Sequence, residues 1–211
     1  MTSNKDPHNR VTNKKVTHKR VIGITGNSGS GKTTVANILA AKGATAIEAD
    51  KVAHKAFEKG TPTYKKIISA FGPGILGQDE EISRKKLGAL VFSDTKKRTQ
   101  LESIVHPFVT EEILKIIEES HSSLIVIDAV LLVEAGLNKH CDIVWLVRAD
   151  ENLRLKRITT RDNLDKQAAE ARMRNQRDTQ HIPAISQGII ENDGDMAALN
   201  SQIEQLLKQL C

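Results

Sequence analysis

The sequence has few aromatic residues, few cysteines and no long hydrophobic run, and each shortage excludes a class of protein. Aromatic residues make up 3% of the 211 residues, which argues against the stacking platforms that bind single-stranded nucleic acid. The two cysteines, Cys141 and Cys211, lie outside any CxxC or His/Cys cluster, so neither a zinc site nor a disulfide framework is indicated. No run approaches the roughly 18–20 apolar residues of a membrane span. We expect a soluble protein with free thiols in a reducing cytoplasm.

The excess of positive charge is confined to the start of the chain. The sequence carries 31 basic and 26 acidic residues, a net charge of +5. Residues 1–20 hold six of the bases and one acid, Asp6, so the remainder is neutral. This tail is too polar to build a core and lacks the apolar centre of a secretory signal. We expect a disordered extension, with a nucleic-acid-binding arm or an organelle-targeting segment as alternatives.

Strand and helix signals alternate after the tail, which is typical of an α/β fold. The predicted strands are Val21–Thr25, Ala44–Ala49, Ser123–Asp128, Asp142–Val147 and Gly188–Ile190. Helices are predicted over Thr33–Lys42, Glu151–Arg161, Lys166–Asp178 and Asp195–Leu210. Continuous apolar runs suit buried parallel strands. We therefore predict a five-stranded parallel sheet covered by helices on both faces.

Residues 51–120 differ, because they show helical signals without a strong strand. The predicted helices run from Thr61-Pro62 to Phe71, over Arg84–Phe92, and from Asp94 to Val105, with Gly72–Asp79 as a loop. His106-Pro107 is predicted to break the last helix and to open another, since proline fits the first helical turn. We expect one domain, 21–211, with its core at 21–50, 121–148 and 186–211, a helical insert at about 51–120 and a helical lid at about 150–180.

The segment Gly26–Thr33 reads GNSGSGKT and fits the phosphate-binding pattern G-x-x-x-x-G-K-[ST] at every fixed position. Glycines let several backbone N–H groups point at one anion, and the following helix directs its positive end there. A lysine adds mobile charge for the β- and γ-phosphates, and a threonine hydroxyl is a hard ligand for magnesium. The residues predicted to bind the nucleoside triphosphate with its Mg²⁺ are Gly26, Gly29, Ser30, Gly31, Lys32, Thr33 and Thr34.

This loop alone does not separate kinases from GTPases or motor ATPases. The sequence lacks the N-K-x-D and D-x-x-G patterns of a GTPase, and it is short for a motor. Small P-loop kinases place an acidic residue after the second strand, a helical substrate-binding insert, and an arginine-bearing lid. Asp50, the block 51–120 and the region Arg154–Arg174 fill these three places.

Over Val21–Leu207 the chain resembles the dephospho-coenzyme A kinase family. The matching stretches are IGITGNSGSGKTTV at 22–35, ADKVAH at 49–54, LE-x-I-x-HP at 101–107 and LL-x-EAG at 131–136. Val130 and Val133 depart from the proline and phenylalanine of the family pattern. The resemblance implies transfer of the ATP γ-phosphoryl group to the ribose 3′-hydroxyl of dephospho-coenzyme A. A kinase of another small metabolite, such as a nucleoside, and a nucleotide-dependent regulator or nucleic-acid binder are the alternatives.

Two carboxylates are candidates for the chemistry. Asp50 stands at the carboxyl end of a predicted strand, where α/β sheets place ligand sites. The resemblance makes it the group that orients the 3′-hydroxyl and accepts its proton, with a helix N-cap as the structural alternative. Asp128 ends the third predicted strand and is expected to hold magnesium through a water, with a capping or solvated carboxylate as the alternative.

Basic and polar residues complete the expected site. Arg157 and Arg161 lie four apart and so share a helix face, which suits a clamp on triphosphate oxygens or a solvated basic face. The resemblance favours Arg161, with Lys32 and Asp50, in catalysis and Arg157 in nucleotide binding. Arg84 is expected to meet the pyrophosphate of coenzyme A, since guanidinium suits phosphate, with helix-surface charge as the alternative. His106 is expected to bind substrate or to fix the Pro107 turn, and Asn192 to lie near the adenine or to serve the turn. Glu134 is a substrate-side or a structural carboxylate, and the arginines expected to be solvated or structural in the lid are Arg172, Arg174 and Arg177.

The ligands expected from this interpretation are ATP, Mg²⁺ and dephospho-coenzyme A, without nucleic acid or membrane. The neutral remainder of the chain and its scarcity of aromatic residues argue against a nucleic-acid partner. We expect a cytoplasmic monomer or weak homo-oligomer.

Overall fold

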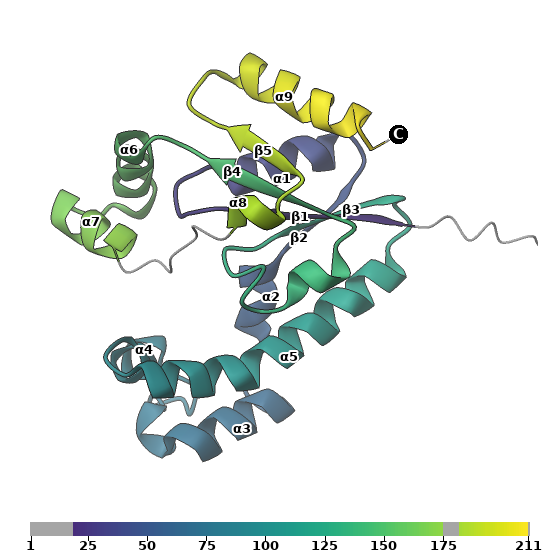
Figure 1. The fold of residues 1–211 in the computed structure, drawn as a ribbon. Coiled ribbons are helices and arrows are strands. Elements are labelled where there is room, and N and C mark those ends of the chain that lie inside the picture. Colours follow the sequence, from purple (N-terminus) through teal and green to yellow (C-terminus); the bar gives the residue numbers. More distant parts are fainter. Residues whose placement is uncertain (1–18, 175–181, 211) are drawn as a thin grey trace, which may run out of the picture.

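The computed structural model describes residues 19–174 and 182–210, which form one parallel sheet with helices on both faces (Figure 1). The strands are β1 (Arg20–Thr25), β2 (Thr45–Glu48), β3 (Leu124–Asp128), β4 (Ile143–Arg148) and β5 (Gly188–Glu191). They are ordered β2-β3-β1-β4-β5, and every neighbouring pair is parallel. The five-stranded parallel sheet predicted from the sequence is therefore confirmed.

The helices alternate with these strands and fill the long segment between β2 and β3. They are α1 (Lys32–Ala41), α2 (Ala49–Lys55), α3 (Pro62–Phe71), α4 (Arg84–Phe92), α5 (Thr95–Glu119), α6 (Glu151–Asp162), α7 (Lys166–Arg174), α8 (Ile182–Ile185) and α9 (Met196–Lys208). Two 3₁₀ turns, η1 (Pro73–Ile75) and η2 (Leu137–His140), lie in the connections. The predicted helix Lys166–Asp178 extends past the described residues, which here end at Arg174.

Two hydrophobic clusters lie on opposite faces of the sheet. One packs Ile22 and Ile24 of β1 against α1 and α9, and the other packs Ile125 and Ile127 of β3 against the helices between β2 and β3. Alternate residues of a strand point to opposite faces, so a fully covered strand is apolar throughout. That is why the strand segments read as continuous hydrophobic runs.

Gly23 of β1 illustrates how closely the second face is packed. A Cβ atom at this position would lie 2.7 Å from a methyl group of Leu132 and 2.8 Å from the Cys141 sulfur. Burial raises the pKa of the Cys141 thiol to about 12, so the thiol stays protonated at neutral pH. Cys141 is a free cysteine, as expected, and Cys211 lies outside the described residues.

The folded region begins earlier than the expected tail boundary at residue 20. Lys19 donates to the carbonyl oxygens of Ile117 and Glu118 at 2.6 Å each, and β1 starts at Arg20. These two residues therefore belong to the domain, because they bond to the last turn of α5 and to the sheet. The rest of the basic tail, residues 1–18, lies outside the described residues.

Pro107 does not break a helix, and the predicted break at His106-Pro107 is wrong. Residues Thr95–Glu119 form one 25-residue helix with Pro107 inside it. A proline in a helix interior removes one hydrogen bond and crowds the preceding turn. Here Val105, Val109 and Ile113 bury one side of the helix in the core, and this long-range packing outweighs the local preference.

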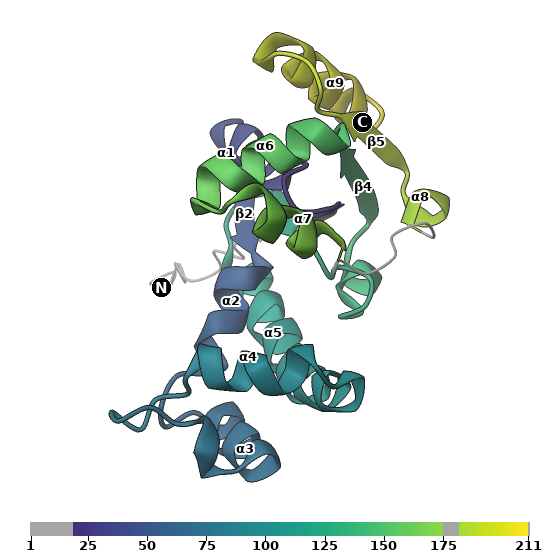
Figure 2. The same cartoon turned by 90° about the vertical axis from the view of Figure 1, so that its left-hand side faces the viewer.

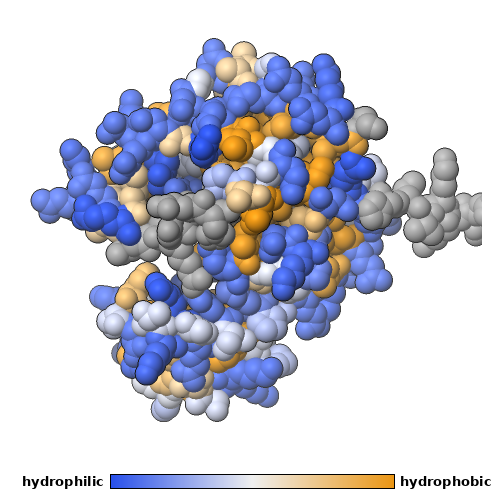
Figure 3. All heavy atoms as spheres, in the orientation of Figure 1, coloured by the Kyte–Doolittle hydropathy of each residue, from blue (hydrophilic) through white to orange (hydrophobic). Residues whose placement is uncertain are grey.

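The segment between β2 and β3 forms a lobe below the sheet. In Figures 1 and 2, α3 and α4 lie against one half of α5, and the other half of α5 runs up to the sheet beside α2. Above this lobe in Figure 1, α6 and α7 stand beside the carboxyl ends of the strands. Figure 3 shows the surface indented between these two parts, with mainly hydrophilic residues over α6 and α7.

Candidate active site

The glycine-rich segment forms the turn between β1 and α1, as its pattern predicts. Gly26, Gly29 and Gly31 have φ angles of 147°, 79° and 96°. Side chains with a Cβ atom rarely adopt these angles, which explains why the pattern needs glycine there. Gly31 is the N-cap of α1 and has no side-chain cap. The helix N-terminus is therefore open to an anion, and it faces a cleft of about 730 Å³.

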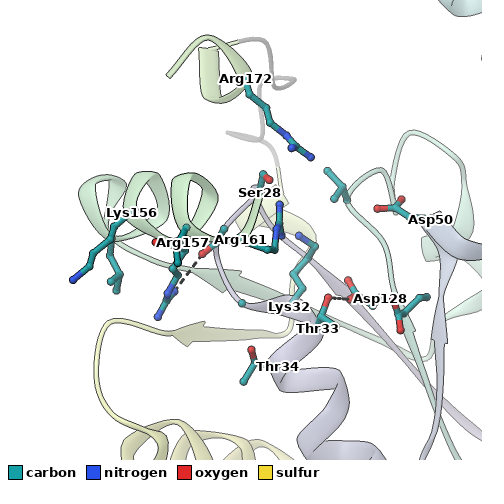
Figure 4. A pocket seen from close by; sticks show the side chains of 16 residues that line it. Ser28, Lys32, Thr33, Thr34, Asp50, Asp128, Lys156, Arg157, Arg161 and Arg172 are labelled. Carbon is teal, nitrogen blue, oxygen red and sulfur yellow. Dashed lines mark hydrogen bonds between the residues drawn. The ribbon is translucent and has the colours of Figure 1, made fainter. Parts of the chain in front are cut away.

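The cleft lies at the carboxyl ends of β1, β2 and β3, where ligands bind in open parallel sheets. Its walls come from the phosphate loop, the strand ends and helices α6 and α7. The lining residues are Ser28, Gly29, Gly31, Lys32, Thr33, Thr34, Glu48, Asp50, Asp128, Val130, Leu153, Lys156, Arg157, Thr160, Arg161 and Arg172 (Figure 4). Gly26 and Ser30 do not line it; Ser30 lines a different cavity, together with Asn27 and Arg148.

Thr33 and Asp128 meet at the bottom of the cleft. The Thr33 hydroxyl donates to Oδ2 of Asp128 at 2.6 Å (Figure 4). The contact follows from the sheet, because β3 pairs with β1 and Ile24 is level with Asp128. Burial raises the pKa of the Asp128 carboxyl, whereas the Thr33 hydrogen bond and the Lys32 charge oppose that rise. Two hard oxygen ligands, one on a buried carboxylate, suit a divalent cation such as magnesium.

Lys32 brings a buried positive charge to the same place. Its residue is 8% exposed, and Nζ donates to the Asn27 carbonyl oxygen at 3.4 Å. Burial lowers the pKa of the ammonium group, and the charges of Asp128 and Asp50 act in the opposite direction. An ammonium group that burial destabilises gains most when a phosphate oxygen replaces the missing solvation.

Asp50 lies one element later than expected. β2 ends at Glu48, and Asp50 is in the first turn of α2, whose N-cap is Glu48. Asp50 is therefore not the N-cap, which was its structural alternative. Its side chain is exposed and points into the cleft opposite the phosphate loop (Figure 4). An exposed carboxylate next to a phosphate-binding loop is available to a second substrate.

A second cavity of about 210 Å³ adjoins Asp50 on the side away from the phosphate loop. We call it the acceptor pocket; it is mostly apolar. Its lining residues are Ala49, Asp50, Ala53, Phe57, Leu101, Glu102, Val105, His106, Val109, Ala129, Leu131, Ala135 and Leu137. His106 therefore lies beside Asp50, whereas Arg84 lines neither cavity and has its guanidinium 3.4 Å from Nε2 of His54. Glu134 directly precedes Ala135 of this pocket in the sequence, and its Oε2 is buried without a hydrogen-bond partner among the described residues.

Arg157 and Arg161 both line the cleft, but their side chains have different partners. Arg157 donates to the carbonyl oxygens of Gly29 and Ser30 at 3.3 and 3.4 Å. It also donates to the carbonyl oxygen of Asn192 at 2.9 Å. Arg157 thereby ties α6 to the back of the phosphate loop.

Arg161 makes a two-pronged ion pair with the neighbouring Asp162, with both N···O distances at 2.8 Å. Arg172 of α7 donates to the same carboxylate at 2.6 Å. The Arg161 hydrogen bonds lower the pKa of Asp162 despite its partial burial. Arg174, by contrast, pairs with Glu170 on its own helix at 3.8 Å, and Arg177 lies outside the described residues. One acid thus joins two arginines of α6 and α7 at the rim of the cleft.

Asn192 does not line the cleft, although it is buried next to it. Its residue is 6% exposed, and its side-chain amide donates to the Ser30 carbonyl oxygen at 2.7 Å. The Ser30 hydroxyl is buried without a partner among the described residues. The expected contact of Asn192 with an adenine stays a prediction.

Several site residues lie outside the sequence-based prediction. Leu153, Lys156 and Thr160 line the cleft because they share the face of α6 that carries Arg157. Arg154, one turn before Ile158, donates to the Ser28 carbonyl oxygen at 3.0 Å. The helical spacing of α6 places the first three on the face of Arg157, whereas the Arg154 contact depends on docking of α6 to the loop. Within residues 19–174 and 182–210, no cluster of three His, Cys, Asp or Glu residues forms a metal site.

No helix in the described part of the chain is both long and apolar enough to cross a membrane.

Comparison with known proteins points to one family. A family model for dephospho-CoA kinase matches residues 20–198. The dephospho-CoA kinase of Geobacter sulfurreducens is 38% identical over 189 residues, which cover 88% of this chain and 96% of the relative. That of Symbiobacterium thermophilum is 35% identical over 195 residues, 91% of this chain and 82% of the relative.

The fold of the chain also matches those of solved structures. A Thermus thermophilus protein matches with a TM-score of 0.79 at 29% identity, over 92% of this chain and 99% of its own. The dephospho-CoA kinase of Campylobacter jejuni matches with a TM-score of 0.64 at 28% identity, over 91% and 97%. An Acinetobacter baumannii shikimate kinase, at 19% identity and a TM-score of 0.52 over 91% and 93%, shares the fold.

Proposed function

The chain belongs to the dephospho-CoA kinase family, and from this premise we propose how its own residues carry out the family's reaction. The family catalyses the last step of coenzyme A synthesis, with ATP as the phosphoryl donor. The observation that carries the residue assignment is the position of Asp50. Its carboxylate lines both the phosphate cleft and the acceptor pocket, so it is where a donor and an acceptor can meet.

On the donor side, the phosphate loop binds the β- and γ-phosphates through its backbone N–H groups, from Gly29 to Thr34. Lys32 neutralises the charge of the transferring group, where charge stabilisation dominates catalysis. Arg161 leaves Asp162 to contact the phosphates, and Arg157 supports the loop from behind. This assignment is supported by the positions of Gly29, Lys32, Thr34, Arg157 and Arg161 around one cleft.

We propose that Thr33 and Asp128 hold a magnesium ion, Thr33 directly and Asp128 through a water. Held by these two side chains, such an ion would neutralise negative charge on the triphosphate. The 2.6 Å contact between the two side chains and the burial of the carboxylate support this pair as the metal-binding oxygens.

On the acceptor side, Asp50 accepts a hydrogen bond from the ribose 3′-hydroxyl and takes its proton as the oxygen attacks the γ-phosphorus. The bond from the γ-phosphorus to the bridging oxygen of ATP breaks in the same step, and ADP leaves. His106 contacts the acceptor from α5, where it lines the acceptor pocket. Arg84 binds the acceptor diphosphate, since a guanidinium group suits phosphate. It lines neither cavity, so this role requires movement of the insert, which closing P-loop kinases provide.

The deciding experiment measures ADP release with magnesium and ATP across several acceptors. The acceptors are dephospho-coenzyme A, uridine, adenosine, shikimate and none, each tested with the unmodified chain, Lys32→Ala and Asp50→Asn. We expect stimulation by dephospho-coenzyme A only, lost in both variants. Stimulation by a different acceptor would contradict the substrate, and full activity of Asp50→Asn would contradict the proton acceptor.

We further propose a cytoplasmic protein that acts as a monomer or weak homo-oligomer without nucleic acid. The even charge balance beyond the tail supports the last point. Light scattering across a concentration series tests the assembly state. A stable dimer or trimer at nanomolar concentration would contradict it.

A further inference from the structure

Asn192 reaches the phosphate loop from the far end of the chain. Its backbone N–H donates to the Arg148 carbonyl oxygen at 2.9 Å, which continues the β4–β5 ladder. The side chain is thus fixed at its base by the sheet and at its tip by the Ser30 carbonyl oxygen, at 2.7 Å. A buried amide bonded in this way has one orientation, because a buried polar group that loses its partner is costly.

The same carbonyl group belongs to the peptide that joins Ser30 to Gly31. A peptide is planar and trans, so its C=O and N–H bonds point in opposite directions. Since Asn192 holds the C=O, the Gly31 N–H points away from Asn192. Gly31 lines the cleft and is the N-cap of α1. The side-chain amide therefore sets the direction of an N–H at the centre of the phosphate-binding turn.

Asn192 packs closely against Gly31. A Cβ atom at Gly31 would lie 2.0 Å from Nδ2 of Asn192. Gly31 also needs its φ angle of 96°, which is rare for residues with a side chain. Arg157 completes the arrangement, because its guanidinium bonds to the Ser30 carbonyl oxygen and to that of Asn192.

From these contacts we propose that Asn192 is a positioning residue for phosphoryl transfer, one that fixes the Ser30–Gly31 peptide and does not read the adenine base. The proposal rests on the proposed function. It predicts that the amide contributes to binding of any triphosphate, with or without a base. A misdirected loop also misaligns the γ-phosphate, and small displacements of reacting groups slow a reaction strongly.

The test uses Asn192→Asp, which keeps the shape but replaces the donor with a charged acceptor facing a carbonyl oxygen. Asn192→Ala is the second variant, in case the first does not fold. The control is Asn200→Asp on α9, since Asn200 also donates its amide to a backbone carbonyl, that of Met196 at 2.7 Å, and does not line the cleft. The probes are ATP, ADP and inorganic tripolyphosphate, each with magnesium, and binding is measured by calorimetry.

We expect both Asn192 variants to bind all three probes more weakly by a similar factor, roughly tenfold to a hundredfold. At saturating ATP, kcat should also fall, whereas the KM for dephospho-coenzyme A and every constant of Asn200→Asp should stay unchanged. Loss of affinity for ATP and ADP alone would show a base contact and overturn the proposal. So would a lower unfolding temperature with unaltered kinetic constants, and so would failure of the unmodified chain to bind tripolyphosphate.

The binding measurements need no acceptor. If the unmodified chain binds the probes but does not phosphorylate dephospho-coenzyme A, the proposed function fails and the role of Asn192 is still decided.

Discussion

The two sides of the cleft differ in the chemical groups that line them. On the phosphate side, backbone groups and buried polar side chains hold one another, as in the Thr33–Asp128 contact and the Asn192–Ser30 contact. On the acceptor side, the pocket is lined mostly by apolar side chains of α2, α5 and the turn after β3. P-loop enzymes share the groups that bind the donor phosphates, whereas the acceptor differs from one P-loop kinase to another. Under the proposed function, the phosphate side sets the chemistry and the acceptor side sets the substrate.

The largest effect is expected from Lys32→Met, which removes charge from the phosphate side while keeping an apolar stem. Activity should fall roughly 10³- to 10⁵-fold, as when a P-loop enzyme loses a charge that stabilises the transferring phosphoryl group. Because burial lowers the pKa of this ammonium group, its charged form is penalised in the fold. The unfolding temperature should therefore stay level or rise. Lys42→Met, at an exposed lysine that pairs with Glu204 at 3.0 Å, is the control; a large loss of stability in Lys32→Met would contradict the prediction.

Asp50→Asn tests the boundary between the two sides. We expect kcat to fall about 10²- to 10⁴-fold, because the acceptor loses its proton acceptor. Binding of ATP should be unchanged, since the phosphate loop is intact. Steady-state kinetics and calorimetry measure the two quantities. Glu58→Gln, an exposed carboxylate after α2, is the matched control, and equal loss of ATP affinity and kcat would assign Asp50 to the phosphate side.

Ala53→Leu fills the acceptor pocket without touching the phosphate loop. The KM for dephospho-coenzyme A should rise about tenfold or more, because the larger side chain takes up space that the acceptor would fill, and such overpacking costs about 1–3 kcal/mol. The affinity for ATP should stay the same. Ala89→Leu, on the exposed face of α4, controls for the added methyl groups. An unchanged KM would show that the acceptor binds elsewhere, and this pocket would then not set the substrate.

The pH dependence of nucleotide binding tests the role of Asp128 on the phosphate side. Burial raises the folded pKa of Asp128, so this carboxylate takes a proton at a higher pH than an exposed aspartate. Magnesium–ATP affinity should decline on the acid side from that higher pH, and Asp128→Asn should lose the dependence. For stability the sign is opposite: above the folded pKa the buried charge is unfavourable, and protonation relieves it as the pH falls. Asp128→Asn should thus unfold at the same or a higher temperature at pH 7, whereas exposed Asp79→Asn should match the unmodified chain.

The smallest effect is expected from Asp162→Asn, which frees Arg161 and Arg172 from a shared acid. The Arg161 and Asp162 side chains are 57% and 24% exposed, and such ion pairs contribute about 1 kcal/mol or less. We expect ATP affinity to rise by about fivefold or less at low salt, with the gain shrinking as salt increases. Calorimetry at two ionic strengths measures it. A fall in affinity would mean that Asp162 aligns the arginines and does not compete for them.

The phosphate side follows from the sequence because its rules are local. Gly26–Thr33 specifies a turn by its glycines, and parallel strands bring Thr33 and Asp128 to one edge of the sheet. The five strands likewise follow from their apolar runs. Each of these inferences uses a short stretch of chain and a fixed backbone geometry.

The remaining features depend on contacts between distant segments. Pro107 predicts a helix end by local preference, yet packing of α5 in the core keeps one helix. Arg157 and Arg161 look equivalent in the sequence, but only the docked structure gives one of them to backbone carbonyls and the other to Asp162. Asn192 has a turn-like sequence context and a buried role. Such assignments need tertiary structure, because the partner lies far along the chain.

The side chains that bond to the carbonyl groups of the phosphate loop come late in the sequence, so their contacts form late during synthesis. Arg154, Arg157 and Asn192 bond to loop carbonyls that lie 126 to 162 residues earlier. At about 5–20 residues per second, that gap lasts on the order of ten seconds on the ribosome. We expect stalled chains that end before β5 to bind no nucleotide, which a labelled ATP analogue can test; tight binding would contradict it. A chain that ends before β5 contains the whole of Gly26–Thr33 but lacks Asn192, so we expect nucleotide binding to begin only after the last strand has been made.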